Sequence, residues 1–487
     1  MLCQTVKYLN KYFLSILMED LESLKCSLIK SPGDSSKGRY LHKKKGTDSI
    51  ILHDVPYIFT CDENDKIKMI KNHSIVIKDG VIKEIIPSVN VELNKYNLVY
   101  EAGKKGGVVV TPGLINTHAH PPMYLMRSIM TLDEGEKLEE TISSMPRWER
   151  LMDEKDYAVG AMGDISEQQR YGITTTLSHY GVFNPIDFAA SATNHNVINA
   201  LSAVSNTHPE NSPEMIENLL KKGNYFSKPA IALHYLHKAD DSTLNKVRRI
   251  IKNHDILFTF HMAESKSVEK ECVKRYGIRE VELLKKKGLL NENTITSHSI
   301  YLSDDEIKTL IKAKVGISHL PTSNVIHKSG VFQFWKFCDY GGFQKISLGT
   351  DGVVSKGRVD LLSEAYQTRV THLYHRTVKF GSLFKMVTAN GARVLGLKDR
   401  GKIIPGYRAD LAIWKLNDIS CIPYDYNDPI TLISNLITRG GRPVRDLMID
   451  GKFVIKNRKH QFVNESFLLK QLQKSHMAIR KRSTEFL

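Results

Sequence analysis

The sequence predicts an α/β fold: a TIM (β/α)8 barrel with a small β-sandwich formed from both chain ends. Three observations carry this prediction. Strand-like segments alternate with helix-like segments through the central part of the chain, as in βαβ units that share a parallel sheet. Eight such strands fall within roughly 280 residues, which is the size of one TIM-type barrel. Short β-rich runs with hairpin turns occur on both sides of this central part.

The eight predicted barrel strands are short and mostly apolar, and seven of them end in His or Asp. They are residues 114–120, 173–179, 197–204, 230–234, 256–261, 294–298, 315–319 and 346–351. In a TIM barrel, the active site lies at the C-terminal ends of the strands. The polar strand ends therefore predict an active site at that end of the barrel.

Two sets of shorter β-rich runs flank the barrel. Asp79-Gly80 is a hairpin signal in the first set, and Asp450-Gly451 is a hairpin signal in the second. We expect residues 47–110 and 397–457 to form the two parts of the sandwich, around a barrel of residues 111–396.

The two ends of the chain differ from these units in pattern. Residues 1–46 are expected to be an N-terminal extension that contains one amphipathic helix and then a flexible Ser- and Gly-containing linker. Residues 458–487 are expected to form a C-terminal helical tail. The function of the extension cannot be read from its residues.

Composition excludes several classes of protein. The contents of 41% hydrophobic and 25% charged residues are those of a soluble globular protein, and no apolar run reaches the roughly 18 residues of a membrane span. The early apolar run is too short for a secretory signal, and six cysteines without a CxxC pair favour reduced thiols in the cytoplasm. The net charge of +16 fits a nucleic-acid partner or a solvated basic surface. Because the basic residues are dispersed, we expect neither a nucleic-acid nor a membrane partner.

His118 and His120 end the first predicted barrel strand at i, i+2 spacing. Side chains two residues apart in a strand share a face, so both imidazoles point the same way. Such a pair offers two ligands to one transition metal, although two surface histidines would show the same spacing. Ligands on other strands must decide between these interpretations.

Two other strand ends supply such ligands. His261 ends the fifth predicted strand, and Asp351 ends the eighth. Three imidazoles and one carboxylate can hold one divalent cation and leave a position for water. We therefore expect His118, His120, His261 and Asp351 to be metal ligands.

Glu264 and His298 are the expected proton-transfer residues. Glu264 lies three residues beyond His261 and can accept a proton from water and return it to a leaving group. His298 ends the sixth strand and is expected to polarise the attacked group or to hydrogen-bond the nucleophile. We expect both residues, together with Asp351, to be catalytic. The alternatives are a helix-start carboxylate for Glu264 and a hydrogen-bonded structural histidine for His298.

These motifs, in this order, resemble those of the metal-dependent amidohydrolases. The similar branch holds chlorohydrolases, S-adenosylhomocysteine and methylthioadenosine deaminases, guanine deaminase and triazine hydrolases. The resemblance covers about residues 50–457 and rests on residues 111–120, the HxxE of 261–264, and residues 316–324, 349–352, 388–396 and 405–411. It implies a single zinc or iron ion, hydrolytic removal of ammonia or another leaving group from a heterocycle, and a homo-oligomer. Binuclear relatives carry a carboxylated lysine on the fourth strand, and residues 230–234 contain no lysine.

The resemblance also implies four substrate-binding residues, namely Met123, Arg127, Glu149 and His234. Glu149 stands where the adenosyl deaminases place a ribose-binding glutamate, and an exposed helical charge explains it equally well. His234 matches the family's fourth-strand histidine near the substrate.

Three segments depart from the family pattern. Tyr235-Leu236-His237 replaces a PYT-like continuation, and Ile326 and His327 replace a lysine and a leucine. Lys356-Gly357-Arg358 replaces a small, Asn-rich loop, and it fits either an anionic substrate or a solvated loop. These departures leave the substrate open.

The expected function is metal-dependent hydrolysis of a carbon–nitrogen bond other than a peptide bond. The expected substrate is a small heterocyclic molecule, and the expected reaction is deamination of a purine, a nucleoside-like compound or another heterocyclic amidine. One alternative is a hydrolase that expels an amine or chloride, or opens a ring amide, in a non-nucleoside heterocycle. An alternative of another class is an inactive binding protein with the amidohydrolase fold.

Overall fold

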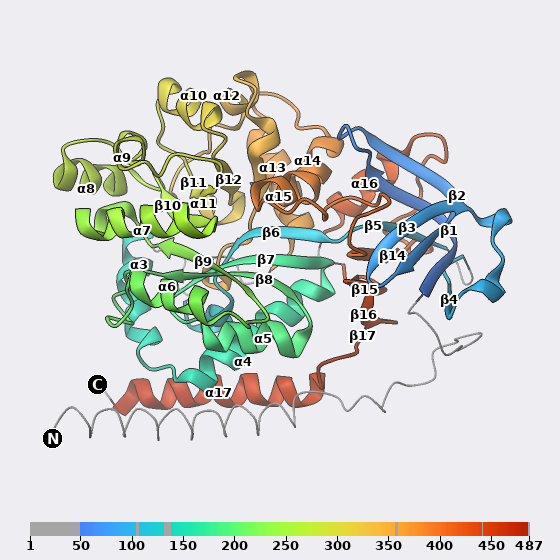
Figure 1. Ribbon diagram of the computed structural model, residues 1–487, viewed down its shortest axis with the longest axis horizontal. Coiled ribbons are helices and arrows are strands. Elements are labelled where there is room, and N and C mark those ends of the chain that lie inside the picture. Colours follow the sequence, from blue (N-terminus) through green and yellow to red (C-terminus); the bar gives the residue numbers. More distant parts are fainter. Residues whose placement is uncertain (1–48, 104–106, 131–137, 356–358, 441, 486–487) are drawn as a thin grey trace.

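The computed structural model describes residues 49–103, 107–130, 138–355, 359–440 and 442–485. Figure 1 shows the barrel and, beside it, a second sheet whose strands come from both ends of the described chain. The predicted N-terminal extension (1–46) and the segment Lys356-Gly357-Arg358 lie outside the described residues.

Eight parallel strands form the barrel in the order β13-β12-β11-β10-β9-β8-β7-β6. Their bounds are β6 (Leu114–Ala119), β7 (Ile173–Tyr180), β8 (Asn196–Ser202), β9 (Lys228–Leu233), β10 (Phe258–Met262), β11 (Thr294–His298), β12 (Gly316–His319) and β13 (Ile346–Leu348). A parallel bridge between Ala119 and Asp351 connects the first strand to the end of the last. Every predicted barrel strand is present, and the predicted fold class is confirmed.

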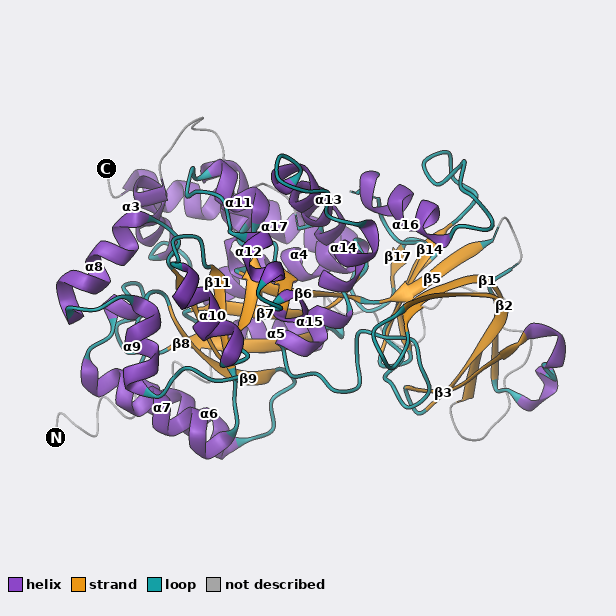
Figure 2. Cartoon of the chain, turned by 90° about the horizontal axis from the view of Figure 1, so that it is seen from above, coloured by secondary structure: helices purple, strands orange, loops and turns teal. Residues whose placement is uncertain are grey.

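Helices enclose the barrel strands, as Figure 2 shows from above. Several begin at sequence-encoded caps, such as the capping box of Asp153 and Asp156 at α4 and that of Ser303 and Glu306 at α10. The helices of the barrel region are α2 (Arg127–Met130), α3 (Leu138–Glu149), α4 (Glu154–Arg170), α5 (Asn184–Thr193), α6 (Pro213–Lys222), α7 (Asp241–His254), α8 (Lys266–Tyr276), α9 (Glu280–Lys287), α10 (Asp304–Lys312), α11 (Pro321–Ile326), α12 (Phe334–Asp339), α13 (Leu361–His372), α14 (Phe380–Met386) and α15 (Ala389–Val394).

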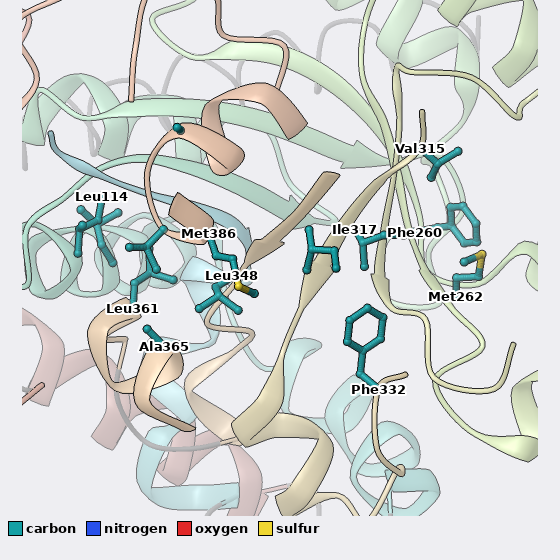
Figure 3. Packing of buried hydrophobic residues seen from close by; sticks show 14 of the residues in the cluster. Leu114, Phe260, Met262, Val315, Ile317, Phe332, Leu348, Leu361, Ala365 and Met386 are labelled. Carbon is teal, nitrogen blue, oxygen red and sulfur yellow. The ribbon is translucent and has the colours of Figure 1, made fainter. Parts of the chain in front are cut away.

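The largest hydrophobic core lies between the barrel strands and these helices and continues to the second sheet and its neighbouring helix at residues 429–438. In β10, Phe260 and Met262 belong to this core, and the intervening His261 faces the cavity inside the barrel mouth. Figure 3 shows side chains of the strands together with Leu361 of α13 and Met386 of α14. Alternation along the strand therefore separates the packing residues from the residues of the site.

The second sheet has nine strands, and both chain ends contribute to it. Its order is β17-β16-β15-β14-β5-β1-β2-β3, and β4 pairs with β1. The bounds are β1 (Ser49–Cys61), β2 (Ile67–Lys78), β3 (Val81–Pro87), β4 (Leu98–Glu101), β5 (Val108–Pro112), β14 (Leu411–Lys415), β15 (Asp446–Ile449), β16 (Lys452–Lys456) and β17 (Lys459–His460). Antiparallel pairing of β5 with β14 joins the two halves. The prediction of one β-structure from both ends is confirmed.

The two predicted hairpin turns contact each other and bring the halves of this sheet together. Gly80 has a φ of 76° and Gly451 a φ of 74°, which favours glycine at both turns. A Cβ atom on Gly451 would lie 2.7 Å from the Cα atom of Gly80, so the contact has no room for a side chain. Arg408 Nε donates a 2.5 Å hydrogen bond to Asp450 Oδ1 beside it.

Two further helices lie outside the barrel layer. Helix α16 (Pro429–Thr438) lies beside the second sheet, and α17 (Glu465–Glu485) runs along α4 (Figure 1). Arg482 Nη2 lies 2.6 Å from Asp156 Oδ2, and Arg170 Nη2 lies 2.5 Å from Glu465 Oε1. Within the described residues, no helix has the length and hydropathy required to cross a membrane.

Candidate metal site and active site

A cavity opens at the C-terminal ends of the barrel strands. Residues from β6, β7, β8, β9, β10, β11 and β13 or the loops directly after them line it, together with residues of α3 and the loops above the strands. This is the end of the barrel at which the polar strand ends predicted a site.

His118, His120 and Asp351 lie at the junction of the first and last strands. His118 Nε2 lies 3.1 Å from His120 Nε2, and Asp351 Oδ1 lies 3.3 Å from His120 Nε2 and 4.0 Å from His118 Nε2. Two nitrogens that each bind one zinc ion at about 2.1 Å lie roughly 3 to 3.4 Å apart. The ring centroid of His261 lies 4.9 Å from that of His118. All four side chains are buried, and their spacing fits a shared divalent ion.

Backbone carbonyls orient two of these imidazoles. His120 Nδ1 donates a 2.6 Å hydrogen bond to the carbonyl of His179, and His261 Nδ1 donates a 2.9 Å bond to the carbonyl of His234. Because a carbonyl can only accept, each Nδ1 carries a proton, and Nε2 is the nitrogen left to face the cluster. Such carbonyl or carboxylate partners are typical of metal-binding histidines.

Burial and charge prepare the cluster for a cation. Burial, reinforced by the neighbouring imidazoles, holds the pKa of His118 and of His261 well below the usual value, so both rings are neutral. Burial opposes ionisation of Asp351, but the hydrogen bond with His120 and the nearby imidazoles outweigh it and hold the pKa of this carboxyl well below its usual range. Neutral imidazoles and an ionised carboxylate are the forms that bind metal.

Glu264 lies beside this cluster in a chain of hydrogen-bonding side chains. Glu264 Oε1 lies 3.4 Å from His298 Nε2, and the hydroxyl of Tyr235 donates a 2.7 Å hydrogen bond to Glu264 Oε2. His298 Nδ1 lies 2.8 Å from Asn324 Oδ1, which leaves Nε2 as the nitrogen that faces the cavity. Glu264 is only 4% exposed and precedes the N-cap Ser265 of α8, so it is not a solvated helix-start carboxylate.

The backbone is in a left-handed conformation at three positions around the cluster. The φ angles are 46° at Ala263, 63° at His298 and 61° at Asp351. Residues with a Cβ atom seldom adopt this region, and such residues are enriched at functional sites. The amide of Asp351 donates a 3.0 Å hydrogen bond to the carbonyl of His118, which fixes the end of the last strand to the first.

Three of the four predicted substrate-binding residues line the cavity. They are Met123, Glu149 and His234. Burial raises the pKa of Glu149.

Arg127 does not line this cavity. Its Nη2 atom lies 2.5 Å from Glu167 Oε2, and its guanidinium lies 4.3 Å from the ring centroid of Tyr124. The structure therefore places Arg127 outside the cavity, with its charge paired to Glu167, and does not bring this predicted substrate-binding residue together with the other three.

Several residues that line the cavity were not predicted as site residues, and three of them carry side chains close to the proposed site. They are His179 on β7, Tyr235 directly after β9, and Lys238, whose Nζ atom lies 3.1 Å from His234 Nδ1. For His179, the one sequence signal was its position at the end of the second predicted strand. Tyr235 stands in a segment that departs from the family pattern, and nothing local distinguishes Lys238 from other loop residues.

Comparison with known proteins agrees with this architecture. A profile of the Amidohydrolase family matches residues 109–454, well over half of the chain. The chain belongs to the amidohydrolase family. The 5-methylthioadenosine/S-adenosylhomocysteine deaminase of Pyrococcus furiosus is 32% identical over 416 residues, which cover 82% of this amidohydrolase and 94% of that protein.

Solved structures share the fold of this amidohydrolase. An adenosine deaminase from Xanthomonas campestris with bound zinc has a TM-score of 0.79 at 20% identity, over 89% of this chain and 98% of that one. Atrazine chlorohydrolase from Arthrobacter aurescens TC1, complexed with zinc, has a TM-score of 0.78 at 18% identity, over 88% of this chain and 100% of that one.

Proposed function

We propose that this amidohydrolase is a hydrolytic deaminase of a purine nucleoside or a similar heterocyclic amidine. The observation that carries the proposal is the position of Glu264, which lines one cavity with His298, His120, His261 and Asp351, whereas the buried ring of His118 lies beside those of His120 and His261. The deaminase relative from Pyrococcus furiosus supports the same reaction class.

The cluster is the proposed site of one divalent ion. His118, His120, His261 and Asp351 would hold it, and zinc is the proposed ion because imidazole nitrogens and one carboxylate suit it. When bound, such an ion acidifies water to a nucleophile near neutral pH. The two structural neighbours named above contain zinc.

Glu264 is the proposed proton carrier. As a carboxylate it accepts a proton from the attacking water, and as a carboxylic acid it returns a proton to the substrate nitrogen. The amino-bearing carbon gains a bond to oxygen and loses its bond to nitrogen, which gives ammonia and a ring carbonyl. His298 Nε2 is positioned to hydrogen-bond the water or the developing oxygen while its Nδ1 stays bound to Asn324.

Three further side chains are proposed to contact the substrate. The Glu149 carboxylate can accept hydrogen bonds from sugar hydroxyls, His234 can bind a ring heteroatom, and Met123 supplies apolar surface beside the ring. Lys238 lies against His234 and adds a positive charge at the same wall of the cavity.

Two further properties are proposed, the oligomeric state and the compartment. Homo-oligomerisation follows from the family resemblance. The cytoplasm is the proposed compartment, because the four cysteines among the described residues, Cys61, Cys272, Cys338 and Cys421, are free thiols.

The test is ammonia release by the metal-loaded protein and by the apoprotein. The panel contains adenosine, 5-methylthioadenosine, S-adenosylhomocysteine, guanine, a pterin and an amino-triazine. Metal-dependent release from an adenosine-type compound is expected. If no compound releases ammonia although one metal is tightly bound, deamination is wrong and hydrolysis of an amide or halide becomes the better assignment.

A further inference from the structure

The ring of His179 lies among the proposed metal ligands. The four imidazoles of His118, His120, His179 and His261 have centroid separations between 4.8 and 5.7 Å for all six pairs. Imidazoles that bind one zinc ion through nitrogens at about 2.1 Å have ring centroids roughly 5 Å apart. The ring of His179 therefore lies at the distance from the other three rings that is expected for imidazoles bound to one ion.

The ligand atoms give the same result. One nitrogen each of His118, His179 and His261 lies within 4.8 Å of the other two, and the ligand atoms of His118, His120 and Asp351 form a second such group. Two atoms bound to one ion at about 2.1 Å lie at most about 4.2 Å apart. The 4.8 Å range of the histidine group is slightly wider than this limit, so the inference requires these nitrogens to move closer together when the ion binds.

His179 has an unsatisfied polar atom and a fixed backbone. Its side chain is only 2% exposed, and Nδ1 has no hydrogen-bond partner within the described part of the chain. An unpaired buried polar atom costs free energy. The carbonyl of the same residue accepts the 2.6 Å hydrogen bond from His120, so the backbone is already part of the cluster.

His319 provides a contrast within the same barrel. It also ends a strand and is buried with an unpartnered Nδ1, but its Nε2 atom lies 3.2 Å from His372 Nε2 on α13. This histidine belongs to the packing between strand and helix and does not line the cavity. Position at a strand end therefore does not account for the placement of His179.

We infer that His179 is a further ligand of the metal ion, so that four imidazoles and the Asp351 carboxylate form the centre. The inference rests on the metal site of the proposed function. Four neutral nitrogen ligands and a single anionic oxygen favour zinc, cobalt, nickel or iron over magnesium and calcium. They also leave the bound ion with a net positive charge.

The test is metal binding, which needs no substrate. His179→Phe keeps an aromatic ring of similar size without a ligand atom, and His179→Gln keeps polarity with a much weaker ligand. Each variant is loaded with Co²⁺, and the visible absorption spectrum and the dissociation constant are measured by chelator competition. His319→Phe is the matched control, since it removes a buried strand-end imidazole outside the cavity.

We expect both His179 variants to bind Co²⁺ at least ~10-fold more weakly than wild type, with altered ligand-field bands, while His319→Phe matches wild type. Unchanged affinity and spectrum in either folded His179 variant would overturn the inference. If neither variant folds, a structure of the wild-type protein with Co²⁺ decides, because a ligand nitrogen must lie about 2.0 to 2.1 Å from the ion. A wild-type protein that binds no metal would instead contradict the proposed function itself.

Discussion

The hydroxyl of Tyr235 donates a 2.7 Å hydrogen bond to Glu264 Oε2, and both side chains are buried in the cavity. This bond occupies one carboxylate oxygen and leaves Oε1 facing His298. Tyr235 is therefore a positioning residue for the proposed proton carrier, and it stands in a segment that departs from the pattern of similar enzymes.

Tyr235→Phe removes this hydrogen bond and keeps the ring. We expect turnover to fall at least ~10-fold with KM nearly unchanged, because a hydrogen bond to a charged group contributes roughly 1.5 to 3 kcal/mol. The measurement is steady-state ammonia release at constant metal content. Tyr374→Phe, at a side chain that is 99% exposed, is the control. An unchanged turnover number in Tyr235→Phe would show that Glu264 does not need this contact.

Glu264→Gln tests the proton carrier itself. The amide has the size of the carboxylate but cannot accept and return a proton, so we expect at least ~100-fold slower turnover with metal content preserved. Metal is measured by elemental analysis and turnover by ammonia release. Glu282→Gln, on the exposed side of α9, is the control. Retained activity in Glu264→Gln would remove Glu264 from the mechanism.

Asp351→Ala tests the carboxylate of the metal cluster. Removing the negative charge and one oxygen ligand is expected to weaken metal binding at least ~10-fold. The measurement is metal stoichiometry after dialysis against a weak chelator. Asp305→Ala, with a side chain that is 95% exposed, should keep the wild-type stoichiometry. Full retention in Asp351→Ala would exclude Asp351 as a ligand.

The buried carboxyl of Asp164 is expected to make the free energy of unfolding depend on pH. Burial raises its pKa from 3.8 to about 7 in the folded state, so the folded protein keeps a proton that the unfolded chain releases near pH 4. Stability is therefore lost as the pH rises from about 4 to about 7, by up to about 4 kcal/mol at 1.36 kcal/mol for each pKa unit.

Asp164→Asn should remove this contribution to the pH dependence. We measure the free energy of unfolding of Asp164→Asn and of wild type by urea denaturation. We expect the difference, variant minus wild type, to increase between pH 5 and pH 8. Asp305→Asn should show no such change, because its carboxylate is exposed. A constant difference between Asp164→Asn and wild type across this range would contradict a buried, protonated Asp164.

Parts of the second sheet show where local patterns fail. Strand β1 runs from Ser49 to Cys61, although Asp54 and Pro56 within it do not favour a strand. The register shifts between Leu52 and Val55, and Asp54 adopts a φ of 54°, so a bulge carries the strand through residues of low β propensity. The short strands β4 and β17 were not predicted. Their residues adopt the strand conformation because they pair with β1 and β16, and not because of a local sequence pattern.

By itself, the sequence determined the eight-stranded barrel and placed its site at the polar strand ends. Apolar runs, turn residues and the spacing of His118 and His120 are local properties that can be read along the chain. The tertiary structure alone decided which strand ends meet. The side chain of His179 lines the cavity, whereas that of His319 points outward to α13. The register of the strands and the alternation of side chains along each strand decide these directions. Contacts between distant residues, such as Tyr235 with Glu264 and Arg127 with Glu167, exist only once the barrel has closed.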